Sequence, residues 1–399
     1  MGKAAILLVL GFSLILGIVT PNLHRQANRA VENYLSYQKK SQAHNIATSA
    51  ANIAANKLFL DSTWKTGYSN VSFTGGKFSV TVRDTLTNMK KIEAIGTYID
   101  SAETVRVLLQ PSSYSKFAYY SKIEGAINWI SKDTVWGPLH SQAKLNIPLP
   151  NSPVFFGKVT TRLGTNPTKS KAKFYGGYQK GVNLDLPADI SGVVNAANAG
   201  GRVFATGDLW LTFENGNVKW KTTATGTVTT QTLSSFAPNG VILAAKGNIH
   251  VQGTIDGRAT VCATGSSGLG FGNIYVDDDI RYKADPRTGA SDDMLGLVTE
   301  NNVFVTDNAA NNSDCRIDAA IFCLKGGLTA ENYNTRPISG TLYLYGGVTQ
   351  YQRGPVGTYS GTTINHGFQK NYKYDNRLLV SSPPNYPMTG SFEIVSWLE

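Results

Sequence analysis

The pattern of apolar and polar residues changes character twice along this chain. Residues 4–20 carry no charge and are almost entirely apolar. Residues 22–59 contain neither glycine nor proline, and apolar or small residues recur there at helical spacing opposite a charged face. We therefore expect one long helix over residues 1–61, apolar in its first third and amphipathic afterwards. Pro21 lies at the junction and is expected to kink the helix without ending it.

After residue 70 the apolar positions alternate with a period of two. One strand pair is expected to turn at Gly75 and Gly76, and a second pair near Asp100 and Ser101. Residues 62–110 are thus predicted to form an antiparallel β meander that completes a module with the helix. Pro111 and the serines that follow it mark the expected boundary with a β-rich head over residues 111–399.

The head shows short apolar strands that recur with glycine or asparagine turns, most clearly over residues 200–350. Recurring strand–turn–strand units favour a right-handed β-helix, or solenoid, in which stacked rungs bury a ladder of aliphatic side chains. The C-terminal segment is expected to cap this core. The irregular spacing of the strands leaves a β-sandwich as the alternative. The fold class is therefore mainly β with one long N-terminal helix.

Composition adds a constraint on partners. The chain has 399 residues, 16% of them charged, and a formal net charge of +10. That excess favours acidic partners such as an anionic polysaccharide or DNA, although the lysines are scattered and also fit a solubilising surface.

The cysteines and polar loops leave two structural questions open. Cys262, Cys315 and Cys323 form no CxxC motif and have no neighbouring histidine pair, so a zinc site is not expected. Cys315 and Cys323 are close enough in sequence to form a disulfide if the segment between them turns, and buried free thiols are the equal alternative.

One loop of the head contains polar residues that could bind calcium. Oxygen ligands are available in one loop, although they lack EF-hand spacing. The candidates are Asp307, Asn308, Asn312 and Asp314. No other cofactor is expected.

Two groups of residues raise the question of catalysis. His140 and Ser141 could form a nucleophilic pair oriented by Asp133, but adjacent strand residues point to opposite faces and no G-x-S-x-G elbow is present. We expect His140 to turn inward and to hold its turn by hydrogen bonds. Asp277 and Asp279 could serve a polysaccharide-active enzyme, but a solvated turn or an ion-ordered loop is favoured. No catalytic residue is therefore assigned.

The first sixty residues resemble the N-terminal helix of type IV pilins and pseudopilins, and most closely that of PilX-like minor pilins. The resemblance implies a short leader that ends at Gly2, with Lys3 as the first mature residue. Gly11, which precedes FSLIL, is the other candidate, but cleavage there leaves only a stub of the apolar segment. Leu7 stands where pilins usually carry a glutamate, which argues against a major filament subunit. A plain signal anchor remains the alternative.

Residues 117–160 and 340–399 resemble an uncharacterised domain found behind PilX-like N-termini in bacterial surface proteins. The first region carries W-x-x-x-D from Trp129 to Asp133 and G-P-L-H-S-Q over residues 137–142. The second carries related motifs around Arg353 and Arg377. The motif positions singled out are Asp133, Gly137, His140 and Ser141. The family has no established activity, so the resemblance supports placement rather than mechanism.

These patterns predict a non-enzymatic cell-surface protein, a minor pilin or pseudopilin that displays a large β-rich head for pilus assembly or adhesion. Other pilin-like subunits would contact its N-terminal helix. The helix would lie in the bacterial inner membrane with the head outside, and later at the cell surface or in a pilus. The alternatives are a membrane-anchored polysaccharide-active enzyme on a β-helix and an adhesin that binds DNA or another anionic polymer.

Overall fold

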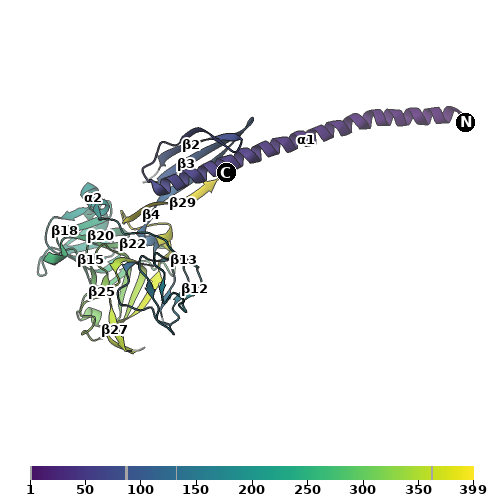
Figure 1. The fold of residues 1–399 in the computed structure, drawn as a ribbon. Coiled ribbons are helices and arrows are strands. Elements are labelled where there is room, and N and C mark those ends of the chain that lie inside the picture. Colours follow the sequence, from purple (N-terminus) through teal and green to yellow (C-terminus); the bar gives the residue numbers. More distant parts are fainter. Residues whose placement is uncertain (1, 86–88, 132, 361–362) are drawn as a thin grey trace. The chain divides into compact units, whose positions relative to one another are not determined.

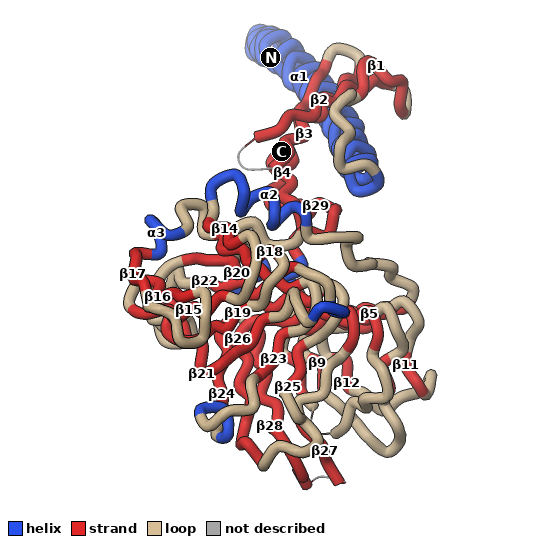
Figure 2. The backbone as a smooth tube through the Cα atoms, turned by 90° about the vertical axis from the view of Figure 1, so that its left-hand side faces the viewer, coloured by secondary structure: helices blue, strands red, loops and turns tan. Residues whose placement is uncertain are grey.

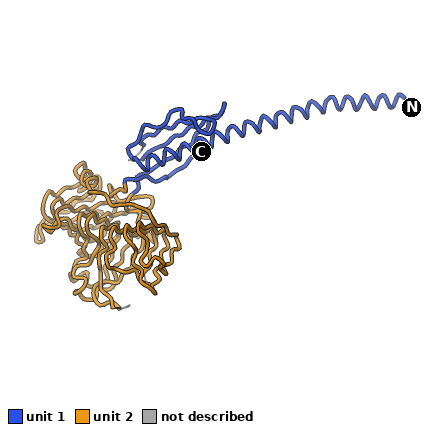
Figure 3. Tube along the Cα trace, viewed as in Figure 1, with its two compact units in different colours: residues 1–112, 390–399 blue, residues 113–389 orange. Residues whose placement is uncertain are grey.

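The computed structural model describes residues 2–85, 89–131, 133–360 and 363–399. The chain is mainly β with one long N-terminal helix, as the sequence predicts (Figure 1). It divides into two compact units, residues 1–112 with 390–399 and residues 113–389 (Figure 3).

The N-terminal helix α1 runs without interruption from Gly2 to Leu60 and continues through Pro21. The predicted continuity at this proline is therefore confirmed. Residues 2–38 are exposed, whereas the last third of the helix buries one face made mostly of alanine. The buried residues are Ala43, Ile46, Ala47, Ala50, Ala51, Ala54, Ala55 and Leu58. Ile53, one of the apolar residues at helical spacing in this part of the chain, faces solvent instead.

The same unit contains a five-stranded sheet in the order β1-β2-β3-β4-β29. Its strands are β1 (Tyr68–Phe73), β2 (Gly76–Thr85), β3 (Met89–Tyr98), β4 (Ser101–Ser113) and β29 (Met388–Leu398). Strands β1 to β4 pair antiparallel, and both predicted turns are present. Thr74 and Gly75 at the first turn have positive φ, as a two-residue hairpin of type I′ requires.

Strand β29 departs from the predicted division, which gave all of residues 111–399 to the head. Residues 390–399 belong to the first unit. Phe392 enters the apolar core between α1 and the sheet, and Glu393 accepts a hydrogen bond of 2.6 Å from Ser112 Oγ. Pairing β29 with β4 covers a strand edge that would otherwise be open.

The helix lies unusually close to strand β3 at Gly96. A Cβ placed on Gly96 would lie 2.3 Å from the carbonyl oxygen of Ala43 and 2.4 Å from the backbone nitrogen of Ala47. Only glycine in the strand and small residues on the helix allow this approach. The contact explains the alanine-rich face of α1.

The second unit is built mainly from two ladders of parallel strands (Figure 2). In the longer ladder, neighbours along the ladder are paired in the order β14-β18-β20-β22-β24-β26-β5-β7-β10-β13. Its strands are β14 (Arg202–Phe204), β18 (Val241–Ala245), β20 (Arg258–Thr264), β22 (Met294–Thr299), β24 (Cys315–Cys323), β26 (Ile338–Gln352), β5 (Tyr119–Ile123), β7 (Leu139–Ser141), β10 (Val159–Thr161) and β13 (Tyr178–Lys180).

The second ladder follows the order β15-β19-β21-β23-β25. Its strands are β15 (Leu209–Glu214), β19 (Ile249–Ile255), β21 (Ile274–Tyr282), β23 (Val303–Val305) and β25 (Leu328–Ala330). Shorter parallel pairs and hairpins complete the unit: β6 (Thr134–Val135), β8 (Leu145–Asn146), β9 (Val154–Phe155), β11 (Thr165–Asn166), β12 (Lys173–Phe174), β16 (Asn217–Lys221), β17 (Thr229–Thr232), β27 (Gly357–Ser360) and β28 (Thr363–Tyr374).

The longer ladder does not follow the order of the chain. It runs from residue 202 to residue 352 and then continues with residues 119–180, because β26 pairs in parallel with β5. Aliphatic side chains fill the interior, while the outer face of the longer ladder is covered by helix α2 (Ser191–Gly200) and aromatic residues near the C-terminal part. Strand β22 is buried at every position, as is typical of parallel strands covered on both faces.

Of the two alternatives for Cys315 and Cys323, the structure excludes the disulfide. Cys315 and Cys323 are the two ends of the continuous strand β24. At ~3.3 Å per residue their Cα atoms are about 26 Å apart, whereas a disulfide requires less than about 7 Å. Both are buried free thiols, and so is Cys262. Burial raises the pKa of the Cys323 thiol to about 12, which makes it unreactive at neutral pH.

Substitution of Gly96 tests the contact between α1 and the sheet. We expect Gly96→Leu to lower the free energy of unfolding of the first unit by at least about 3 kcal/mol, because the new side chain would collide with helix backbone. Urea unfolding followed by circular dichroism measures the change. Gly17→Leu is the control, since a Cβ there meets nothing within 4 Å. Equal stability of the two variants would contradict the contact.

Candidate functional site

Three successive rungs of the second unit repeat one sequence pattern. The segments VWGPLHS, FFGKVTT and FYGGYQK begin at residues 135, 155 and 174, and their strands pair in register. A Cβ on Gly157 would lie 2.1 Å from the carbonyl oxygen of Gly137, so the glycine column is required by close stacking. The pattern of short apolar strands did not reveal this repeat. Its signal in the sequence is an aromatic residue directly before a glycine, which recurs about every twenty residues.

The aromatic residue of each repeat forms a stacked column outside the rungs. Trp136 and Phe156 have ring centroids 4.1 Å apart, and Phe156 and Tyr175 have centroids 5.4 Å apart. The ring planes are nearly parallel, at 12° and 21°. We call these three residues the aromatic column. Trp136 retains 56% of its surface exposed, although Phe156 covers one of its faces.

A cavity of ≈ 80 Å³ opens beside Trp136, and we call it the head cavity. Its walls come from Ala118, Tyr119, Trp129 and residues 133–136, from Leu328, from strand β26 with Arg353 and Gly354, and from strand β28. The structure thus brings together motif residues that lie more than two hundred positions apart in sequence. These are Trp129, Asp133, Gly346, Gln350, Arg353 and Tyr372.

A buried ion pair supports one wall of the cavity. Arg353 Nη1 lies 3.4 Å from Glu124 Oε2, and both side chains are almost fully buried. Glu124 also accepts hydrogen bonds from Tyr119 Oη at 3.0 Å and from Trp129 Nε1 at 2.9 Å. The Arg353 guanidinium lies over the Trp129 ring, 4.2 Å from its centroid. Burial and the Glu124 charge raise the pKa of Tyr119, so this phenol stays protonated and donates.

A second cation of the cavity has no such support. Within the described residues, the ammonium of Lys370 has no hydrogen-bond or ion-pair partner. Burial, followed by the charge of Arg353, lowers the pKa of Lys370 to about 8. Asp133 shares the cavity wall, and one of its carboxylate oxygens accepts a hydrogen bond of 2.8 Å from the backbone of Ile130. No pattern in the sequence indicates Lys370 or Glu124, because a single charged residue in a strand or directly after one usually faces solvent.

The other motif residues hold the rungs together next to this cavity. His140 is fully buried, with Nδ1 2.8 Å from Thr160 Oγ1 in the next rung and its ring stacked on Tyr120. It therefore connects two rungs rather than closing its own turn. Ser141 points to the opposite side, 3.0 Å from Ser121 Oγ. A Cβ on Gly137 would lie 2.6 Å from the Tyr374 ring.

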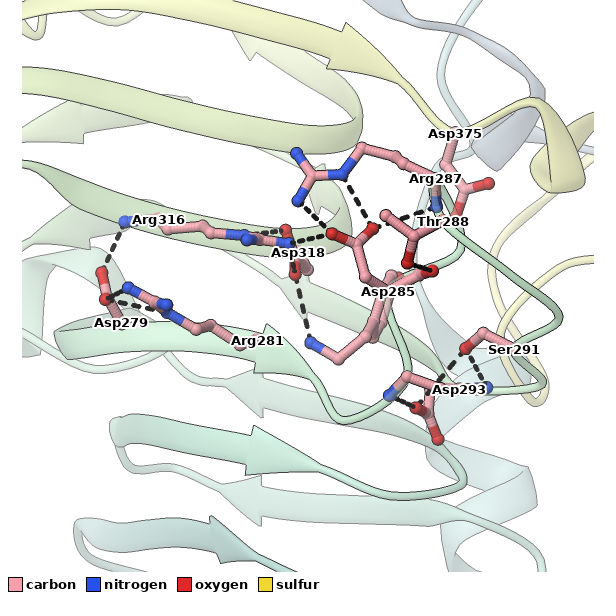
Figure 4. A network of polar contacts seen from close by, with 12 residues as sticks. Asp279, Arg281, Asp285, Arg287, Thr288, Ser291, Asp293, Arg316, Asp318 and Asp375 are labelled. Atoms are coloured by element: carbon pink, nitrogen blue, oxygen red, sulfur yellow. Dashed lines mark hydrogen bonds and ion pairs between the residues drawn. The ribbon is translucent and has the colours of Figure 1, made fainter.

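The acidic residues considered for catalysis are engaged with other protein side chains. Asp277 contacts His250 Nδ1 at 2.9 Å. Asp279 pairs with Arg281 and accepts a hydrogen bond of 2.6 Å from the backbone of Arg316 (Figure 4). In the same network Arg316 contacts the fully buried Asp318 through two nitrogens. This arrangement pairs Asp279 with a guanidinium and connects adjacent strands.

The tail is attached to the same region. Asp375 is fully buried and binds the guanidinium of Arg377, which donates to the carbonyl of Ser291 at 2.8 Å. Ser291 also contacts Asp293, whose carboxylate accepts a hydrogen bond from the backbone of Gly257 at 2.6 Å (Figure 4).

Two of the four calcium candidates contact a buried arginine. Arg336 lies with Nη2 3.4 Å from Asn312 Oδ1 and 3.9 Å from Asp307 Oδ1, and its side chain is fully buried. Asn308 Oδ1 accepts from the backbone of Asn311, and Asp314 Oδ1 accepts from that of Thr341. Among the described residues no group of three His, Cys, Asp or Glu side chains is placed to hold a metal. A calcium ion here stays a prediction, and it would compete with the guanidinium.

The predicted processing residues lie on the exposed part of α1. Gly2 and Lys3 are exposed in its first turn, and a Cβ on Gly2 would meet nothing within 4 Å. Helix α1 contains a stretch with mean hydropathy 2.4, none of it buried, whose length and composition suit a membrane span.

Removal of Glu124 tests the buried pair. We expect Glu124→Ala to lower the free energy of unfolding of the second unit by about 3–5 kcal/mol, because Arg353 would remain buried without its counter-charge. Glu214→Ala is the control, since Glu214 pairs with Lys219 at a half-exposed site and should cost less than about 1 kcal/mol. Thermal and urea unfolding measure both. Similar losses of unfolding free energy in the two variants would show that the Glu124–Arg353 pair stabilises the unit no more than an exposed pair does.

We expect the stability of the second unit to depend on pH through His140. Burial lowers its pKa from 6.5 to about 4, so the unfolded chain binds a proton that the folded chain excludes. The unfolding free energy should therefore fall as the pH drops from about 6.5 to about 4, by up to about 1.4 kcal/mol per pH unit. His140→Gln should remove this part of the slope. His24→Gln, on the exposed helix, should keep it, and identical slopes in all three proteins would refute the assignment.

Comparisons with known proteins show a likeness in structure but none in sequence. No family model matches the chain, and no curated protein matches it. Among solved structures, the chain is similar to the competence-associated pilin ComZ from Thermus thermophilus, with a TM-score of 0.39 and 12% identity over 90% of this chain and 97% of that one. A likeness of this size carries no conclusion about function, so the proposals below rest on the chain itself.

Proposed function

We propose that this chain is a type IV pilin-like surface subunit, anchored by α1 and displaying the second unit as its head. The observation that carries the proposal is the division of α1 into two parts. Its last third packs on an antiparallel sheet, while residues 2–38 are exposed and include the uncharged apolar run. This pairing of an unpartnered apolar helix with a small sheet is the arrangement that the N-terminal resemblance implies.

The exposed run has the dimensions of a membrane segment. Seventeen helical residues span about 26 Å, close to the roughly 30 Å of a bilayer's hydrocarbon core. So much exposed apolar surface is costly in water and requires lipid or other apolar helices around it. The same segment can therefore serve as an inner-membrane anchor before assembly and as the contact with other pilin-like subunits afterwards. The head would lie outside the inner membrane, then at the cell surface.

We further infer that the head is a β-helix. Support comes from long runs of parallel, in-register strands, in which most strands of the main ladders pair with the strand two places further along the chain. A β-sandwich is built from antiparallel sheets and does not produce this pattern.

We propose that the chain is a minor subunit of the assembly and not an enzyme. Leu7 provides no carboxylate for a neighbouring N-terminus, and a head of more than 250 residues would be bulky at every position of a filament. The contacts of Asp277 with His250 and of Asp279 with Arg281 support a structural role for these carboxylates over a catalytic one.

Cleavage of the N-terminus tests the proposal. We expect mass spectrometry of the protein from its native host to find a chain that begins at Lys3. Gly2→Leu should block this cleavage, and Gly11→Leu should not. The two variants are matched, because a Cβ at either glycine meets nothing within 4 Å and neither should affect folding.

The other outcomes are equally informative. A wild-type chain that begins at Met1 would indicate a plain signal anchor. A chain that begins after Gly11 would move the leader to the second glycine. A chain that begins beyond Thr20 would show that the apolar run is discarded, and the pilin-like function would fail.

A further inference from the structure

We propose that the head cavity binds an acidic sugar, with the sugar's carboxylate between Lys370 and Arg353 and its ring against the indole of Trp136. The proposal gives the displayed head a ligand. It rests on the proposed function only for the location of the head outside the membrane, because every residue of the site belongs to the second unit.

The first argument is the unpaired ammonium of Lys370. A cation in a confined site is costly unless an anion or several hydrogen-bond acceptors compensate it. The structure supplies such compensation to the neighbouring Arg353 through its direct contact with Glu124, but within the described residues no hydrogen bond or ion pair does the same for Lys370, on which Glu124 and Asp133 act only through space. A ligand carboxylate would complete the site.

The second argument is charge and hydrogen-bonding capacity. Arg353, Lys370 and Lys373 face two carboxylates, Glu124 and Asp133, which leaves an excess of one positive charge at the cavity. A ligand with a single negative charge balances it. Glu124 is the one hydrogen-bonding partner that the described residues give to the Arg353 side chain. The other N–H groups of the guanidinium can therefore donate to a carboxylate.

The third argument is the aromatic column. Phe156 covers one face of the Trp136 indole, and 56% of Trp136 remains exposed, so the opposite face is available at the cavity. Phe156 and Tyr175 stack behind it and hold the ring in place. A flat, rigid indole of this kind suits the apolar face of a sugar ring. Within the described residues, one oxygen of Asp133 has no donor, and it can accept a hydrogen bond from a sugar hydroxyl.

Size restricts which part of a polymer can enter. A volume of ≈ 80 Å³ holds a few groups the size of a water molecule, enough for a carboxylate and part of one ring. We therefore infer that the cavity takes the acidic end of a saccharide chain, or a single uronic acid, rather than the interior of a polymer.

The experiment uses the full chain in detergent micelles, with glucuronic acid as the probe and glucose as its neutral match. Calorimetry and tryptophan fluorescence report binding, because Trp129 and Trp136 line the cavity. We expect saturable binding of glucuronic acid with one site per chain. Glucose should bind at least about tenfold more weakly, since a charge-assisted contact is lost.

Two variants test the assignment of the residues. Lys370→Met should weaken glucuronic acid binding about tenfold or more, and Trp136→Ala should do the same through loss of the ring contact. Lys180→Met is the control, because Lys180 is an exposed lysine of the same unit outside the cavity. This variant should bind glucuronic acid with the affinity of the unaltered chain. Trp136 is largely exposed, so its variant keeps the test valid if Lys370→Met fails to fold.

The pH gives an independent readout. Arg353, Glu124 and Asp133 are the charged groups that act on Lys370, and Lys373 lines the same cavity. Binding should weaken across this range as Lys370 loses its proton, and the weakening should be absent in Lys370→Met.

Three results would overturn the inference. One is equal affinity for glucose and glucuronic acid. Another is acetate binding as tightly as glucuronic acid, which would identify a simple carboxylate site. The third is binding of a single-stranded oligonucleotide at the cavity when glucuronic acid does not bind there. Each is distinguishable from failure of the pilin-like function, which the N-terminal mass tests separately.

Discussion

The constraint on which the head depends is the register of its stacked parallel strands. When each rung pairs with the next without a shift, residues at equivalent positions must form columns along the stack. Leu139 therefore lies beside Val159, and His140 beside Thr160. The same constraint aligns similar side chains in columns, such as Phe155 stacked on Phe174 inside the unit and the aromatic column outside it. It also excludes a side chain at Gly157, where the next backbone passes too close.

The first unit follows a different constraint, the distance between a helix and a sheet. Alanines on α1 and Gly96 on β3 bring the two backbones together, so this part of the helix is stabilised by close packing rather than by large apolar side chains. Upstream, large apolar residues such as Leu8 and Ile15 are exposed. The helix thus buries its small residues within the unit and leaves its large ones for another environment. That distribution would be unfavourable in a soluble protein and is consistent with an anchor.

Local patterns in the sequence predicted the elements that depend on neighbours along the chain. The helix through Pro21 and the hairpin at Gly75 were predicted because periodicity and turn chemistry are encoded within a few residues. Elements that depend on distant partners were not. The disulfide between Cys315 and Cys323 was a fair alternative because a strand buried on both faces shows no alternation that would distinguish it from a turn. Nothing within residues 388–398 indicated that this strand would pair beside β4.

The cavity illustrates the same limit. Motif similarity singled out Trp129, Asp133 and Arg353, but their meeting depends on the pairing of β26 with β5, which joins the late rungs to the early ones. That junction would otherwise leave two exposed strand edges.

The Glu124–Arg353 pair lies at this junction and contacts both parts of the chain. A buried pair of this kind contributes little net stability compared with apolar residues, but the wrong pairing of rungs would leave a buried charge without its partner. The pair therefore favours one arrangement of the early and late segments over others. Because Glu124 satisfies Arg353 and not Lys370, the same junction that closes the fold leaves a cation available to a ligand.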